Sequence, residues 1–295
     1  MTQADDLSPG RQSDVAGADN TEDRAWYLYG IIRAPQFSPE RAAGVGSKIV
    51  PALDSLTVGS MSLGVLSVRD LAAVVRAVPR SDFTEESLQS RLRDPATLEQ
   101  MVRAHNEVIA AIHERQAILP AKLGGVYASL EDLREALQDG ADSLRIQLDR
   151  VEGCDEWAVH VYAEREAVER YVASDRPSIR QLREDLTKAS PGRAYFLKRK
   201  LSNDLAAATD QALSELAQSA YDQLKRFAVE GRASLPSGGA AEREGAIEVL
   251  RAAFLVSRVD ADAFLSAVNS LYGDREGLHC EYSGPLAPYS FAAEG

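Results

Sequence analysis

The amino-acid sequence predicts an α+β protein with two domains, the second of them ferredoxin-like with a long helical insertion. At roughly 100 to 200 residues per domain, the chain's 295 residues favour two domains over one. Its 45% hydrophobic and 26% charged residues are typical of a globular protein. From Trp157 onward the predicted order is strand, helices, strand, helix, strand, which favours an α+β sandwich over a parallel doubly wound sheet. The predicted divisions are a disordered tail at residues 1–24, an N-terminal α+β domain with connecting helices at 25–152, and the ferredoxin-like domain at 153–295.

The N-terminal domain is expected to begin with strands. Residues 1–24 are rich in Asp, Ser and Gly with almost nothing large to bury, which predicts the disordered tail. Residues 26–32 (WYLYGII) combine aromatic and β-branched side chains and predict a buried strand. Two further apolar runs, 63–68 and 71–78, are separated by one polar pair and predict a hairpin.

Helices are expected to follow the hairpin. A short surface helix is predicted at 84–92, and Asp94 with Pro95 begins a longer one, because Asp accepts bonds from free backbone N–H groups and Pro has no N–H to leave unpaired. Ser129, with Asp132 three residues on, resembles a capping box and predicts one helix reaching about residue 150 that joins the domains. The residues expected on the buried face of the longer helix are Leu98, Met101, Val102, Ile109 and Ile112.

The second domain is expected to contain one very long helical region. Between Gly192 and Gly231 no Gly or Pro interrupts a stretch of strong helix formers, which predicts one long helix or two in line. The other predicted elements are a strand at 156–162, a mobile loop at 231–245, a strand at 247–256, a helix at 260–271 and an edge strand at 278–283.

Charge and cysteine content narrow the function classes. A formal net charge of -12 repels nucleic acid unless the basic residues gather in one patch; the densest run, residues 198–200, is expected to be a solvated helix face instead. Cys154 and Cys280 are too few for a disulfide framework and are expected to be buried small hydrophobes. The chain shows no signal peptide and no apolar run long enough to span a membrane, so we expect a cytoplasmic protein.

No catalytic, cofactor-binding or metal-binding residue is predicted. His105 and His113 lie on one predicted helix, but eight residues separate them by about 80° around it and about 12 Å along it, too far to ligate one metal. His160 and His279 are expected to be structural strand residues. The glycines at 124 and 125 lack a phosphate-loop pattern and predict a turn.

Four segments carry a family resemblance. They are YLYGII at 27–32, HNEVIAAIHERQAILPAKLGGVYAS at 105–129, PGRAYFLKRK at 191–200, and the stretch from VLRAAFLVSRVDADAFLSAVNSL at Val249 to YSGPLAPYSF at Phe291. In this order and spacing the chain resembles the GvpF/GvpL family of gas vesicle proteins over nearly its whole expected ordered length.

The resemblance implies a non-enzymatic accessory factor that is needed to assemble gas vesicles and works in the cytoplasm or on the vesicle. Its implied partners are the shell protein GvpA and other gas vesicle accessory proteins, with no cofactor, nucleic acid or membrane. Shell subunits expose apolar surface and strand edges before incorporation, and a soluble acidic partner would hold them apart. The residues expected to contact partners are Tyr27, Tyr29, Tyr195, Phe196, Lys198, Pro285, Pro288 and Tyr289.

Each of these contact residues has a structural alternative. The aromatic strand and the closing tail serve equally well for core packing and chain-end anchoring, and the aromatic residues after the Pro191-Gly192 turn serve for domain packing. A different function also stays open: a small-molecule-binding or enzymatic ferredoxin-like protein whose site is assembled from scattered residues. A third reading is a structural component of the vesicle wall.

Overall fold

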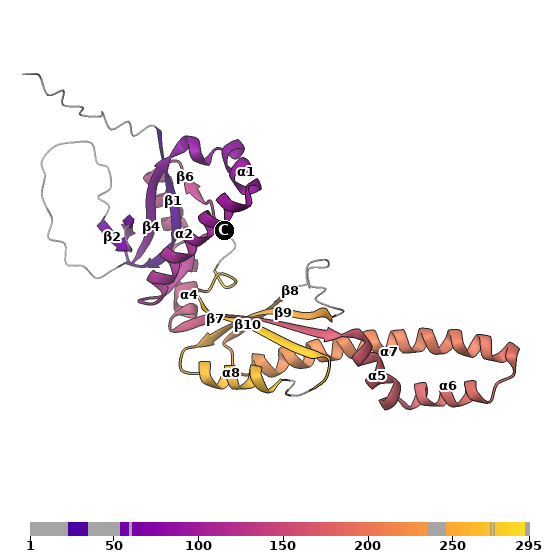
Figure 1. Ribbon diagram of the computed structural model, residues 1–295. Helices are drawn as coiled ribbons and strands as arrows, with labels where there is room; N and C mark the ends of the chain where they lie inside the picture. The colour runs from indigo at the N-terminus through magenta and orange to yellow at the C-terminus, as the bar shows by residue number, and fades with distance from the viewer. Residues whose placement is uncertain are drawn as a thin grey trace, which may run out of the picture.

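The computed structural model describes residues 23–34, 54–58, 61–234, 246–271, 273 and 275–292. It has two antiparallel sheets with helices, and a pair of helices that projects beyond the second sheet (Figure 1). The tail predicted at 1–24 lies outside the described residues except for Asp23 and Arg24, and Arg24 already belongs to the first strand.

The first sheet confirms the predicted strand and hairpin. Its order is β2-β3-β4-β1-β5, with β6 also paired to β1, so the aromatic strand β1 lies inside the sheet. Arg69 turns the β3-β4 hairpin with φ 56, in the left-handed region. Three strands were not predicted, β2, β5 and β6, of which β5 and β6 are too short to show a period. The bounds are β1 (Arg24–Arg33), β2 (Asp54–Val58), β3 (Met61–Val68), β4 (Leu71–Pro79), β5 (Ile118–Pro120) and β6 (Val126–Tyr127).

Two predicted helices after the hairpin are confirmed. The 3-10 helix η2 (Arg80–Phe83) and helix α1 (Glu85–Arg93) precede α2 (Pro95–His113), whose cap Asp94 accepts a bond from the N–H of Thr97 at 3.0 Å. Val102 was expected on the buried face of this helix, and that prediction is wrong, because Val102 is 37% exposed. The buried residues of α2 begin only at His105, and α2 packs on α1 as well as on the sheet.

The single helix predicted to reach residue 150 is wrong. It is two helices, α3 (Leu130–Asp139) and α4 (Ala141–Val151), with Gly140 as the last cap of one and the first cap of the other. The periodic leucines of both halves still pack on one core, so the apolar pattern did not reveal the break at Gly140. The predicted cap is confirmed, since Ser129 accepts a bond from the N–H of Asp132 at 3.1 Å.

The second sheet has the order β10-β7-β9-β8, with every neighbouring pair antiparallel. The predicted strands, the long unbroken helix and the later helix are confirmed. Cys280 lies opposite Val161 rather than near Cys154, and both thiols are free. The bounds are β7 (Cys154–Glu164), α5 (Arg165–Asp175), α6 (Pro177–Thr187), α7 (Pro191–Lys225), β8 (Glu230–Ser234), β9 (Ala246–Ser257), α8 (Ala261–Ser270) and β10 (Leu278–Leu286).

Strand β8 corrects the loop predicted at 231–245. Its sequence, EGRAS, has weak strand propensity, but β9 supplies the backbone ladder, with Gly231 opposite Phe254. The hydroxyl of Tyr221 on α7 donates to the carbonyl oxygen of Gly231 at 2.7 Å and fixes the strand against the helix. The rest of the predicted loop, residues 235–245, lies outside the described residues.

The two sheets share one hydrophobic cluster. Helices α3 and α4 contribute Leu133 and Leu148 to it, and the second sheet contributes Leu255. Phe291, close to the end of the chain, is fully buried in the same cluster beside residues of β3 and β4. The closing residues therefore pack where the two sheets meet.

Candidate functional site

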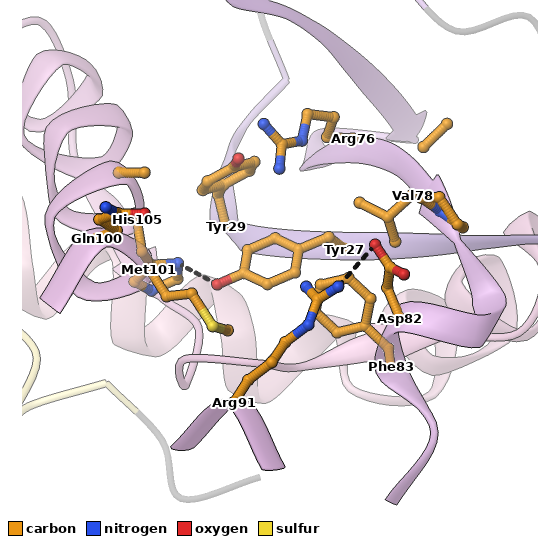
Figure 2. Close-up of a pocket in the computed structure, with 13 residues that line it drawn as sticks. Tyr27, Tyr29, Arg76, Val78, Asp82, Phe83, Arg91, Gln100, Met101 and His105 are labelled. Carbon is orange, nitrogen blue, oxygen red and sulfur yellow. Dashed lines mark hydrogen bonds and ion pairs between the residues drawn. The ribbon is translucent and has the colours of Figure 1, made fainter. Parts of the chain in front are cut away.

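The predicted contact residues lie in three separate places: a groove over β1, the closing tail, and the projecting helices. The groove has a volume of about 410 Å³ and is bordered by β1, β4, α1 and α2. Figure 2 shows Tyr27 at its centre, with His105 of α2 on one side and Phe83 on the other. Tyr27 and Tyr29 are only 5% and 2% exposed, so the packing alternative describes both rings.

A chain of hydrogen bonds connects Tyr27 and His105 of this groove to the backbone of Ala121 and Gly124. His105 Nε2 lies 3.1 Å from the carbonyl oxygen of Ala121, which only accepts, so this nitrogen donates. Its Nδ1 then accepts from the hydroxyl of Tyr27 at 2.8 Å, and that hydroxyl accepts from the backbone N–H of Gly124 at 3.3 Å. Gly124 has φ 83, and the predicted turn at these glycines is confirmed.

Burial favours the neutral forms of His105 and Tyr27. It lowers the pKa of His105 and raises the pKa of Tyr27, and in both it outweighs the hydrogen bonds. At the mouth, Arg91 is paired with Asp82 at 2.9 Å (Figure 2). Four of the polar groups that converge here therefore pair with one another, Tyr27 with His105 and Arg91 with Asp82.

The closing tail is anchored by its side chains and its backbone. The buried carboxylate of Glu156 accepts two bonds from Ser290, from the backbone N–H and from the hydroxyl, each at 2.7 Å. Burial raises the pKa of Glu156. The guanidinium of Arg150 donates to the carbonyl oxygen of Phe291 at 2.5 Å, and Arg232 lies over the Phe291 ring at 5.1 Å. The last described residues are thus held to the second sheet by ionic and aromatic contacts.

The predicted tail residues differ in exposure. Pro288 is buried and Pro285 is exposed, while Tyr289 is 38% exposed. The hydroxyl of Tyr289 donates to Asn106 of α2 at 2.7 Å, and burial raises its pKa to about 12. Pro285 and Tyr289 line a groove of about 350 Å³ between the tail and α2. Chain-end anchoring accounts for Pro288, and Pro285 remains open to solvent.

The same groove contains an ionic contact between the two halves of the chain. His113 at the end of α2 lies 2.8 Å from the carboxylate of Asp155, which also accepts from Arg258 at 3.0 Å. Arg258 donates in addition to the carbonyl oxygen of His113 at 2.9 Å. Burial lowers the pKa of His113 despite the neighbouring carboxylate. These groups connect the two halves of the chain.

The third place is a helical arm, which we define as residues 176–208: helix α6 and roughly the first five turns of α7. In Figure 1 these two helices run alongside each other and project past the second sheet. The first buried residue of α7 is Thr209. Tyr195 and Phe196 are 64% and 72% exposed, and their rings meet edge to face at 5.6 Å. The domain-packing alternative does not describe them.

Within the part of the chain that the structure describes, no three His, Cys, Asp or Glu side chains are grouped to hold a metal ion. None of the described helices is both long enough and apolar enough to cross a membrane.

The family model for gas vesicle synthesis protein GvpL/GvpF matches residues 25–293. The chain belongs to the GvpL/GvpF family. It is 31% identical over 271 residues to gas vesicle protein L of Streptomyces sp. (strain CB03234), covering 92% of this chain and 93% of that relative. It is 30% identical over 270 residues to gas vesicle protein F of the same strain, covering 90% and 98%.

Solved structures of GvpF proteins share the fold of this GvpL/GvpF chain. The crystal structure of GvpF from Anabaena sp. PCC7120 superposes with a TM-score of 0.59 at 20% identity, covering 92% of this chain and 99% of that one. GvpF from Microcystis aeruginosa gives a TM-score of 0.58 at 18% identity, covering 91% and 99%. The arrangement of two sheets with helices is therefore shared at low sequence identity.

The arm of this GvpL/GvpF chain also holds residues that the sequence reading missed. Lys198 is exposed beside the aromatic pair, as expected of a solvated helix face. Further exposed cations lie on α6 and on the turn after it, in the same arm: Arg180, Arg183 and Lys188. A count of charges over a window of about 30 residues would have found this excess of basic residues, whereas a search for consecutive basic residues did not.

Proposed function

We propose that this chain is a non-enzymatic assembly factor for gas vesicles that works in the cytoplasm by binding the shell protein GvpA, other accessory proteins, or both. Membership of a gas vesicle synthesis family supports the setting. The observation that carries the binding role is the aromatic pair Tyr195 and Phe196, held largely in solvent at the end of a long helical pair. Large exposed aromatic side chains are typical anchors of protein interfaces.

We further infer that the chain divides into two domains near residue 153 and that the second is ferredoxin-like. Support comes from the order strand, helix, strand, strand, helix, strand, in which β8 is the second strand and the arm extends the first helical connection. On this division the arm is an insertion into a common fold, which is a frequent place for binding residues.

The competing small-molecule function has less support. It requires a pocket whose polar groups converge on an empty centre. In the groove over β1, Tyr27 and His105 are bonded to each other, and Arg91 is bonded to Asp82. A ligand there would have to break these bonds or take its polar contacts from Tyr29, Arg76 and Gln100, which also line the groove.

The test is capture of gas vesicle proteins by the tagged chain in cells that also express the shell protein and the other accessory proteins. We expect the wild type to recover at least one of them. The variant with Tyr195→Ala and Phe196→Ala should recover at least about tenfold less of that protein. Aromatic anchors of interfaces typically contribute about 2 kcal/mol or more to binding, which is roughly a factor of 30 in affinity. Its melting temperature should stay nearly unchanged, because both rings are mostly in solvent.

A matched control keeps the comparison specific. Tyr171 on α5 is 65% exposed and lies outside the arm, so Tyr171→Ala removes a similarly exposed aromatic ring without changing the arm itself. We expect this control to capture partners as the wild type does. A wild type that captures no gas vesicle protein, in cells that make vesicles equally well without it, would contradict the proposed function.

A further inference from the structure

The arm carries charge opposite to that of the rest of the chain. Residues 176–208 contain eight Lys or Arg and three Asp or Glu, a net charge of +5. The whole chain has 33 basic and 45 acidic residues, so the remainder has 25 and 42, a net charge of -17. The arm is thus positive and the rest of the chain strongly negative. Folding alone does not require this division, since gathering charges of one sign in one region costs free energy.

Most of the arm's cations are not used inside the molecule. Arg176 and Lys200 pair with Glu215 and Asp204. The other six are exposed, and none of them forms an ion pair with any described residue: Arg180, Arg183, Lys188, Arg193, Lys198 and Arg199. They lie on α6, on α7 and on the turn between them, and those of α7 are within three residues of the exposed aromatic pair, so charge and apolar contact area occur on the same arm.

Resting on the proposed function, we propose that the end of the arm docks onto an acidic surface of a partner gas vesicle protein, with Tyr195 and Phe196 as the apolar anchors of that contact. Four of the six free cations are arginines, whose planar guanidinium groups bind carboxylates in pairs of parallel hydrogen bonds. Arginine and aromatic residues together are the types most enriched at the energetic centres of protein interfaces.

Two other anionic partners fit the arm less well. A helix that lies in a membrane surface needs a broad apolar face, whereas Ile179 and Leu197 are buried or half-buried within the arm and leave only the two rings in solvent. A nucleic-acid backbone would attract the arm but would meet a body of net charge -17 behind it. A localised acidic patch on a protein avoids both difficulties.

The test reverses the charge of the arm and compares it with the same change elsewhere. The arm variant combines Arg193→Glu, Lys198→Glu and Arg199→Glu. The control combines Arg80→Glu, Arg93→Glu and Arg115→Glu, which are exposed, have no ion pair with a described residue, and change the net charge equally. Each tagged chain is co-expressed singly with the shell protein and with each other accessory protein, and captured at about 50 mM and about 500 mM NaCl, since salt screens exposed charges.

We expect the wild type and the control to capture at least one of these proteins, the arm variant to capture at least about tenfold less of it, and high salt to reduce wild-type capture. Equal capture by all three chains overturns the docking proposal but leaves the proposed function intact. No capture by the wild type overturns both. Wild-type binding to phosphatidylserine vesicles or a short DNA duplex that the arm variant loses, with protein capture unchanged, reassigns the arm to a membrane or nucleic acid and overturns the docking proposal.

Discussion

Removing one hydroxyl tests whether the chain of hydrogen bonds under α2 stabilises the N-terminal half. Tyr27→Phe keeps the ring, which is 5% exposed, and deletes the group that donates to His105 and accepts from Gly124. His105 stays buried beside the substituted ring, whereas Gly124 is half-buried. A buried polar group left without its partner costs about 1 to 3 kcal/mol. With Gly124 N–H able to reach water in part, we expect a loss of about 2 kcal/mol in the free energy of unfolding.

The matched control is Tyr29→Phe in the same groove. Tyr29 is 2% exposed and stacks on His105 at 5.7 Å, but its hydroxyl bonds none of the described residues. We expect this substitution to change the free energy of unfolding by about 0.5 kcal/mol or less. Urea denaturation of both variants, followed by circular dichroism, gives the two values. Equal losses in the two variants would refute the hydrogen-bond reasoning, because each substitution keeps its ring and removes only a hydroxyl.

Two further predictions concern the core and the pH dependence. Leu148 is 1% exposed in the cluster shared by both sheets, and Leu148→Ala should lower the free energy of unfolding by about 2 to 5 kcal/mol. Ile146 on the same helix is 69% exposed, so Ile146→Ala should change the free energy of unfolding by about 0.5 kcal/mol or less. Equal urea midpoints for the two variants would contradict the shared core. Burial lowers the pKa of His105 and His113 in the folded state. As the pH falls through the ordinary histidine pKa near 6.5, the unfolded chain therefore binds more protons than the folded chain does. The free energy of unfolding should accordingly fall as the pH drops from about 7.5 to about 5.5. The variants His105→Gln and His113→Gln should each flatten that fall, and an unchanged pH slope in both would count against it.

The sequence predicted the elements whose own pattern decides their structure. The aromatic strand β1, the hairpin, and the unbroken α7 all follow from local composition and from the positions of Gly and Pro. Strand β8 was missed because its residues are poor strand formers and its ladder is supplied by β9. The break at Gly140 was missed because the leucine spacing continues across it on both sides.

Site prediction was limited by the same difference between local and distant information. Burial of Tyr27 depends on His105 and Phe83, which are far along the chain, so the aromatic strand alone does not separate a core residue from a contact residue. The free cations of the arm come from two helices that meet only in the folded chain. Tyr195 and Phe196 were predicted as contact residues from their position after the Pro191-Gly192 turn, but only the structure shows that both rings are exposed.

The three predicted contact regions differ in how much of their binding capacity is already used. Over β1, the hydroxyl of Tyr27 and the ring of His105 satisfy each other. In the tail, Ser290 uses both of its donors on Glu156, and the neighbouring ring and backbone are held by arginines. Only the arm combines unpaired cations with aromatic rings in solvent. Unpaired groups can bind a partner without first breaking a hydrogen bond or ion pair inside the molecule. Substitutions in the arm should therefore reduce partner capture more than substitutions in the groove or the tail do. The number of unpaired groups, rather than the size of a cavity, should decide how large the reduction is.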